Sequence, residues 1–400
     1  MTSLAQFISS PDAKGRESRS LLLLATLLYL PLLFFGYGTD VDSYHVVEAG
    51  ERIVEGLPYE HSRAPGFLIH EVATGLLDGL GGSIATNLGS LVMALVALGS
   101  FVALCRRLRV PHPLLLGLTL AVHPQFWASA TSTMDYVWAL GFGLAGGVLL
   151  WDRRWGWAGV LFALAVGSRI TSVLLIVVLA GAVFWLRAED RRGVLVSVGL
   201  GFGLGALCFV PTLLQYGGTL AFLVPIGAEE QAGWSWVERL GRFGYKNVYV
   251  WGLPAAFVLL VSLGRAIVAR PALIVVQRVA LGLAAAGMLL YEALYLRYPL
   301  EPEYLLPVIP FVLIGVGLGV GRRWVMALFL TVLCYNVASV NLARPDRPNH
   351  AESVEYGVWL EPGYLATDVA QRLRVRECRS FACWTERSAN GTYPDLFGEP

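Results

Sequence analysis

Long apolar segments alternate with short polar turns along most of this 400-residue chain. A helix that crosses roughly 30 Å of hydrocarbon needs about 20 residues, or somewhat fewer where neighbouring helices shield it from lipid. The alternation therefore predicts about eleven transmembrane helices. Their expected spans are residues 20–36, 84–105, 113–130, 134–151, 155–169, 170–187, 193–213, 247–264, 272–296, 304–320 and 323–340.

The composition agrees with this pattern. Hydrophobic residues make up 56% of the chain and charged residues only 15%, and the mean hydropathy is +0.60. These values lie well outside the range of soluble domains. We therefore expect an all-α integral membrane protein of the cell membrane. The formal net charge of +1 gives no support for binding to nucleic acid.

Basic residues fall in every second loop, as expected of loops that face the cytoplasm. The pattern predicts a cytoplasmic N-terminal segment (1–19), a transmembrane domain (20–340) and, with an odd number of crossings, a small extracytoplasmic C-terminal segment (341–400). The first outer loop then spans residues 37–83, and another large outer loop spans residues 215–247. The basic residues that define this pattern are Lys14, Arg16, Arg19, Arg106, Arg107, Arg109, Arg153, Arg154, Arg187, Arg191, Arg192, Arg265, Arg270, Arg322 and Arg323.

The first outer loop carries a dense polar cluster, "GYGTDVDSYHVVEAGERIVEGLPYEHSRAPG", at residues 36–66. Apolar residues recur in it at helical spacing, which predicts an amphipathic helix that lies along the membrane surface and ends at Gly56 and Pro58. At the start of this helix, Asp42 or Ser43 is a natural N-cap. Asp40 lies ahead of both, so the capping hypothesis leaves it without a structural role.

Further polar residues lie at the outer ends of predicted spans. Asp135 falls in the turn before the fourth span, and Arg169 falls between the fifth and sixth spans. An arginine at such a boundary also occurs simply because its charged end reaches the interface, but an outer position is unusual for a basic residue and favours a functional role. The segment "LYLRYPLEPEYLLPVIP" adds Arg297, Glu301, Glu303 and Tyr304 at another outer boundary.

The C-terminal segment contains Cys378 and Cys383, which are close enough in sequence to form a disulfide if this segment faces an oxidising compartment. It also contains an "NGT" sequon at Asn390. The other cysteines, in or beside apolar runs, are expected to be buried apolar side chains.

The motif "DVDSY" after the first span, followed by "EGLPYE" and "RAPG", resembles the first outer loop of GT-C glycosyltransferases. More narrowly, it is similar to the protein O-mannosyltransferase and aminoarabinose transferase branch, which uses polyprenyl-phosphate sugars. The stretches "WGWAGVLFALAVGSR" and "EPEYLLPVIPF" resemble later elements of that branch. Valine stands where the branch has the second member of an adjacent acidic pair, so both flanking aspartates remain candidates for the catalytic acid.

The resemblance implies a GT-C-like fold and an inverting transfer of sugar from a polyprenyl-phosphate donor to a glycan, lipid or protein acceptor, without a covalent intermediate. Asp40 or Asp42 would then take the proton from the acceptor hydroxyl. The remaining candidates are substrate-binding residues, with arginines placed to stabilise the departing phosphate. They are Tyr44, Arg63, Asp135, Arg169, Arg297 and Glu303.

No cofactor is expected, although a divalent cation is an alternative. "DVD" resembles the Asp-x-Asp signature that binds magnesium or manganese in enzymes that use nucleotide sugars. A polyprenyl monophosphate has no diphosphate for the cation to bridge. His45, His61 and His70 do not have the spacing of a zinc site.

Two other functions compete with the transferase hypothesis. A multi-pass transporter or flippase of lipid or solute would place charges near the bilayer midplane and would often show inverted repeats. The sequence shows neither feature. A non-catalytic scaffold would leave the polar first loop without an explanation.

Overall fold

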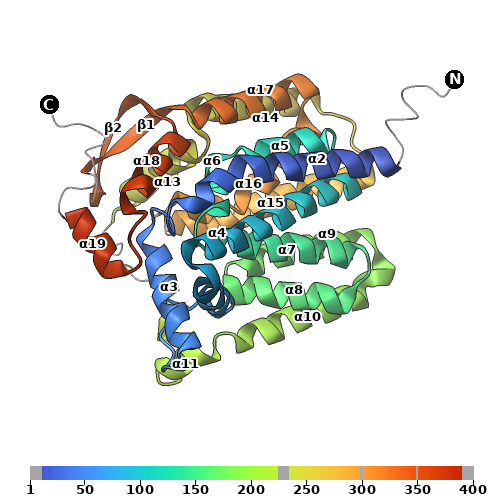
Figure 1. Ribbon diagram of the computed structural model, residues 1–400. Coiled ribbons are helices and arrows are strands. Elements are labelled where there is room, and N and C mark those ends of the chain that lie inside the picture. The colour runs from blue at the N-terminus through green and yellow to red at the C-terminus, as the bar shows by residue number, and fades with distance from the viewer. Residues whose placement is uncertain (1–10, 224–233, 298, 300, 348–349, 390–400) are drawn as a thin grey trace.

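The computed structural model describes residues 11–223, 234–297, 299, 301–347 and 350–389, so the Asn390 sequon lies outside the described residues. Helices pack side by side in a bundle, and a short sheet and two further helices lie at one end of it (Figure 1). Four described helical stretches are long and apolar enough to cross a membrane, or five if a bent pair counts as one. The prediction of a helical membrane protein is confirmed at this level, and the count of about eleven spans stays a prediction.

The four long stretches correspond to predicted spans. The first consists of α2 (Pro11–Tyr29) and the 3-10 helix η1 (Leu30–Phe34). The second is α4 (Leu68–Arg107), and the fourth is α15 (Val275–Arg297). The third joins η2 (Ala188–Asp190), α10 (Arg191–Leu207) and α11 (Val210–Gln215).

Shorter apolar helices fill the centre of the bundle. They are α7 (Tyr136–Trp151), α8 (Trp155–Ser168), α9 (Ser172–Leu186) and α16 (Val308–Gly319). The helix α7 packs against α4 and α8, while α10 packs against α8 and α15 packs against α16. The side chains of Phe101 in α4, Phe162 in α8 and Phe311 in α16 are fully buried.

Two predicted spans are interrupted. The span expected at 113–130 is divided into α5 (Pro113–Ala121) and α6 (Pro124–Ala130), because Pro124 cannot donate the backbone hydrogen bond that a continuous helix needs. The span expected at 247–264 is also wrong in its bounds. Two helices, α13 (Trp236–Trp251) and α14 (Leu253–Ala269), meet there at 97°.

The bend between α13 and α14 has a local cause. Gly252 has a positive φ of 73°, and a proline follows the first residue of α14. The outer loop expected at 215–247 therefore contains most of α13. Ser235 and Glu238 start this helix with a capping box.

The predicted surface helix of the first loop is present as α3 (Val41–Val54). The loop itself is shorter than the expected 37–83, because α4 already begins at Leu68. Non-helical backbone at Gly81 and Gly82 kinks α4 where the predicted span begins. The helices α3 and α4 cross very closely, since a Cβ on Gly75 would clash with the carbonyl oxygen of Gly50.

The C-terminal segment begins with a short sheet that the sequence analysis did not predict. The helix α17 (Arg322–Tyr335) ends before the predicted limit of 340, and the strands β1 (Ala338–Arg347) and β2 (His350–Pro362) form an antiparallel hairpin. A polar side chain pair supports this hairpin: Asn341 Nδ2 donates to Glu361 Oε2 at 3.0 Å. Two helices follow the hairpin, α18 (Tyr364–Val375) and α19 (Phe381–Ala389).

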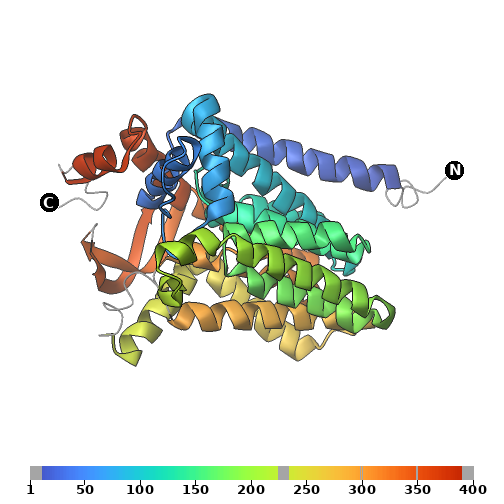
Figure 2. The ribbon, with the colours of Figure 1, turned by 90° about the horizontal axis from the view of Figure 1, so that it is seen from below.

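The two ends of the bundle differ in character. The helices α3, α18 and α19 and the hairpin lie at one end, and the N-terminal end of α2 lies at the other (Figures 1 and 2). Turns that carry the alternating basic residues contact one another at the N-terminal end of α2. Arg106 donates to Ser18 at 2.7 Å, and Arg107 pairs with Asp152 at 2.6 Å. The turns that carry these basic residues therefore lie at the opposite end of the bundle from α3, α18, α19 and the hairpin.

Candidate functional site

A buried ion-pair cluster joins three loops that are distant in sequence. Asp135 Oδ1 accepts from Arg63 at 2.7 Å, and its Oδ2 accepts from Arg169 at 2.6 Å. Asp135 is fully buried and directly precedes α7, whereas Arg169 directly follows α8. A buried charge without a partner lowers the stability of the folded protein, so the loss of any one of these three residues would destabilise the other two.

Arg63 extends the cluster to the first loop. Its second terminal nitrogen pairs with Asp42 at 2.5 Å, and its guanidinium lies 4.6 Å from the centre of the Phe67 ring. The side chains of Arg63 and Arg169 are each only 12% exposed. Asp42, Arg63, Asp135 and Arg169 therefore form an alternating chain of charges. The Nε of Arg63 is a buried donor without a partner among the described residues.

Glu71 holds the loop that carries Arg63. It is fully buried, and its carboxylate accepts from the backbone and the hydroxyl of Ser62 at 2.8 and 2.6 Å and from the hydroxyl of Tyr59 at 2.6 Å. Three donors to one buried carboxylate fix the loop immediately before Arg63.

Aromatic rings surround Arg169. Its guanidinium lies 4.0 Å from the ring centre of Tyr136 and 5.0 Å from that of Tyr304. Such contacts suit a planar guanidinium, which stacks on aromatic faces. Tyr136 was missed by the sequence analysis, although it directly follows Asp135.

Three carboxylates lie beside the ion-pair cluster. One oxygen each of Asp40, Asp42 and Glu301 lies within 4.8 Å of the others. These hard oxygen ligands could hold a divalent cation. Glu301 was not among the predicted site residues, because the sequence analysis selected its neighbour Glu303. Nothing in "EPE" distinguishes the two acids; only the structure places Glu301 in this group, where it also accepts from the Tyr136 hydroxyl at 3.0 Å.

The capping expectation for this loop is wrong. Asp40, and not Asp42 or Ser43, is the N-cap of α3, and its Oδ1 accepts from the backbone of Asp42 at 2.9 Å. Burial, and then the nearby charges of Glu301 and Asp42, raise the pKa of the Asp40 carboxyl. A carboxylate with a raised pKa is a stronger base than an ordinary aspartate.

Glu303 lies in the 3-10 helix η4 (Pro302–Leu305), close to the carboxylate group but with a different partner. Its Oε1 accepts from the hydroxyl of Tyr364 at 3.1 Å. Burial and the charge of Glu301 raise the pKa of Glu303 to about 7.

Two predicted site residues lie elsewhere. Tyr44 is fully buried against Tyr37, with 5.8 Å between ring centres, and its hydroxyl lies 3.4 Å from the carbonyl oxygens of Gly38 and Val375. It thus supports the C-terminal segment. Arg297 ends α15 with an exposed side chain, and its carbonyl accepts from Arg239 at 2.9 Å.

The cysteine pair and the histidines are also placed. Cys378 and Cys383 form a disulfide, and Cys378 packs with Tyr37 and Tyr44. The histidines contact separate partners: His45 lies against the Phe381 ring, His61 against Gln215, and His70 against Trp138.

Comparison of the chain with protein-family models, with curated proteins and with solved structures finds no match.

Proposed function

We propose that this chain is an integral membrane glycosyltransferase that moves a sugar from a polyprenyl-phosphate donor to an acceptor at the extracytoplasmic boundary. The observation that supports this most strongly is that one residue is shared by the group of three carboxylates and the buried ion-pair cluster. Asp42 belongs both to the carboxylate group with Asp40 and Glu301 and to the buried chain that contains Arg63 and Arg169. A transfer of this kind needs a base and a cationic phosphate site within reach of one substrate.

Asp40 is the better candidate for the base. One carboxylate oxygen of Asp42 is already occupied by its pair with Arg63 at 2.5 Å. Among the described residues, Asp40 accepts only a backbone hydrogen bond, and its raised pKa favours proton uptake. In the proposed step, the acceptor oxygen forms a bond to the anomeric carbon, its proton passes to Asp40, and the carbon–oxygen bond to phosphate breaks.

Arg63 and Arg169 are the candidates for stabilising the polyprenyl phosphate that leaves. The unpartnered Nε of Arg63 is a donor that an oxygen ligand could use. Asp135 keeps both guanidiniums charged and in place. Arg297 stays a predicted third candidate, although it lies outside the cluster, and Tyr44 and Glu303 stay predicted substrate-binding residues.

The orientation belongs to the same proposal. The end of the bundle with the basic turns would face the cytoplasm, and the end with the charge cluster and the disulfide would face outward. The charged residues of the site lie at helix ends and in loops. A transporter would instead place such charges near the midplane.

The experiment is a transfer assay with purified protein and labelled polyprenyl-phosphate sugars. Extracts of cells that lack the gene supply the acceptors, so that unmodified acceptor sites are present. Label that moves to a glycan, lipid or protein fraction supports the proposal. Failure of every donor, together with uptake of a lipid or solute by sealed vesicles that contain the protein, would favour transport.

A further inference from the structure

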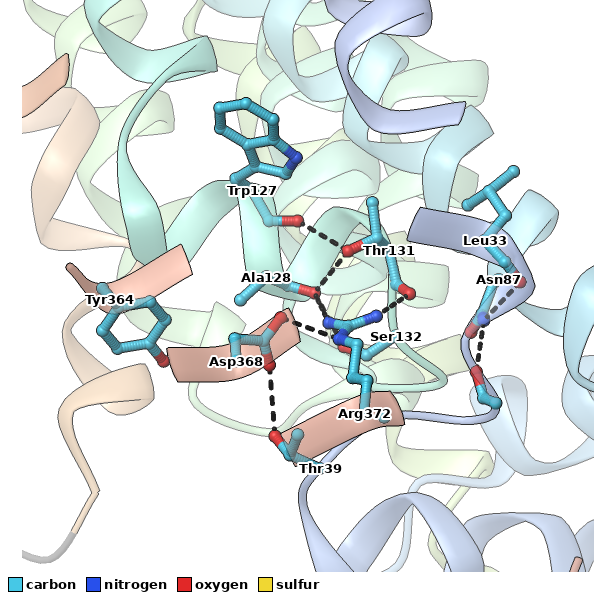
Figure 3. A network of polar contacts seen from close by, with 12 residues as sticks. Leu33, Thr39, Asn87, Trp127, Ala128, Thr131, Ser132, Tyr364, Asp368 and Arg372 are labelled. Carbon is cyan, nitrogen blue, oxygen red and sulfur yellow. Dashed lines mark hydrogen bonds and ion pairs between the residues drawn. The ribbon is translucent and has the colours of Figure 1, made fainter. Parts of the chain in front are cut away.

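The C-terminal helix α18 presents three polar side chains on one face. Tyr364, Asp368 and Arg372 are spaced four residues apart, so they lie one above another along the helix. Asp368 and Arg372 are buried, and the side chain of Arg372 is among the largest that are fully buried in the described chain. Figure 3 shows Asp368 and Arg372 at the centre of a hydrogen-bond network.

Arg372 binds the loop that leads to Asp135. Its Nη1 donates to the carbonyl oxygen of Thr131 at 2.5 Å and its Nη2 to that of Ala128 at 3.1 Å, at the C-terminal end of α6. Carbonyl groups at a helix end have no partner within the helix, and a cationic side chain stabilises them. The loop that begins there carries Asp135.

Asp368 binds the loop that carries Asp40. Its Oδ2 accepts from Arg372 at 2.7 Å, and its Oδ1 accepts from the hydroxyl of Thr39 at 3.2 Å (Figure 3). Thr39 directly precedes Asp40 in the chain. The pair with Arg372 fixes the Asp368 carboxylate, which in turn fixes the residue before the candidate base.

Tyr364 binds the third loop. Its hydroxyl donates to Glu303 at 3.1 Å, two residues after Glu301. Each of the three loops that supply acids to the site is therefore held by a different side chain on the same face of α18.

Two of the three loops are also tied to each other directly. Asn87 Nδ2 donates to the carbonyl of Gly36 at 2.7 Å, and its Oδ1 accepts from Thr133 at 3.0 Å. The backbone of Thr133 donates to Tyr37 at 2.7 Å. These contacts fix the first loop to the second, whereas the third loop is connected through Tyr364 and through the Tyr136 hydroxyl that donates to Glu301.

We propose that α18 is a positioning element that sets the separation of Asp40, Asp135 and Glu301 through Asp368, Arg372 and Tyr364. None of these three side chains needs to touch substrate. The inference rests on the proposed function only for its kinetic consequence; its structural consequence can be measured without substrate.

The structural test is hydrogen–deuterium exchange of the full-length protein in lipid nanodiscs, read by mass spectrometry. Arg372→Lys keeps the charge but loses the fork that spans two carbonyls. We expect exchange in residues 36–42 and 131–135 to become roughly tenfold faster, because local opening of these loops no longer breaks the Arg372 contacts. Residues 101–107, at the far end of α4, should be unaffected. Arg376→Lys is the matched control, because Arg376 follows α18 with an exposed side chain.

The kinetic test uses Tyr364→Phe, which removes one hydroxyl and should fold normally. We expect kcat for sugar transfer to fall roughly tenfold to a hundredfold with KM for the donor unchanged, because the loop that carries Glu301, whose charge acts on Asp40, shifts while Tyr364 itself makes no contact with the donor. Unchanged exchange in Arg372→Lys, or a rise in KM alone in Tyr364→Phe, would overturn the positioning role. If the wild-type protein transfers no sugar, the proposed function fails, and the exchange result still decides this proposal.

Discussion

Arg169 and Asp135 meet as a buried pair at 2.6 Å, although 34 residues separate them in the chain. Each lies at the end of an apolar helix, one directly before α7 and the other directly after α8. The function of either residue could not be decided from its position at the end of a predicted span. Their contact places both in one cluster with Arg63 of the first loop.

Arg169→Met should destabilise the protein strongly, because it leaves the buried Asp135 with Arg63 as its one remaining cationic partner in the described part of the chain. Removing one member of a buried pair costs about 3–5 kcal/mol. Thermal unfolding in detergent measures the effect. Arg323→Met, at an exposed position, is the matched control. Equal unfolding midpoints for the two variants would show that the pair contributes nothing to stability.

Glu71→Gln tests how the Arg63 loop is held. The substitution places an amide group where the carboxylate now accepts from Ser62 and Tyr59. We expect a loss of about 1–3 kcal/mol, because one or more buried donors lose their acceptor.

The control for this change is Glu60→Gln in the same loop. Glu60 forms a surface pair with Arg52 at 3.0 Å, and its side chain is 61% exposed. Such pairs contribute about 0–1 kcal/mol, so the control should unfold nearly as the wild type does. A control that loses as much stability as Glu71→Gln would contradict the account of this loop.

Glu303 should make stability depend on pH. Its pKa is raised to about 7 in the folded protein, against roughly 4.3 in an unfolded chain. Between these values the folded state binds more protons than the unfolded state, so stability should fall as pH rises from about 4.3 to 7. Glu303→Gln removes this dependence.

Unfolding midpoints of the wild type and of Glu303→Gln, measured from pH 5 to 8, test this point. The variant should gain stability relative to the wild type as pH rises. A constant difference between the two proteins across this range would mean that Glu303 ionises in the folded protein as it does in water.

Transfer activity should survive removal of divalent cations. A monophosphate donor offers no diphosphate for a cation to bridge, and arginines lie beside the carboxylate group. Activity with and without EDTA is the measurement. Loss of activity with EDTA, its recovery with Mn²⁺, and absence of that recovery in Glu301→Gln would instead assign a cation to Asp40, Asp42 and Glu301.

The sequence was most informative about the coarse architecture and about which loops carry charge. Apolar periodicity predicted the helices, including α3, because helical spacing is a local property. Arg63, Asp135 and Arg169 were selected separately from three loops, and the structure joins them in direct contact.

Other features depend on contacts that a sequence pattern does not contain. The choice of Asp40 as N-cap depends on the turn that precedes α3. Nothing in the sequence distinguishes Glu301 from Glu303. In the structure Glu301 precedes η4 and accepts from Tyr136, whereas Glu303 lies within η4 and accepts from Tyr364. The role of α18 was missed because Asp368 and Arg372 look like ordinary surface residues of an amphipathic helix until their partners on other loops are known.

The most direct test of the central claim compares transfer from a polyprenyl-phosphate sugar by Asp40→Asn, Asp42→Asn and Asp152→Asn. Asp152 pairs with Arg107 at the opposite end of the bundle and is the control. We predict that Asp40→Asn lowers kcat by roughly 10²–10⁴-fold, the range for loss of a general base, while its unfolding midpoint stays near that of the wild type. Asp42→Asn should lose less activity and more stability, because it breaks the pair with Arg63. Full activity in Asp40→Asn would contradict the account.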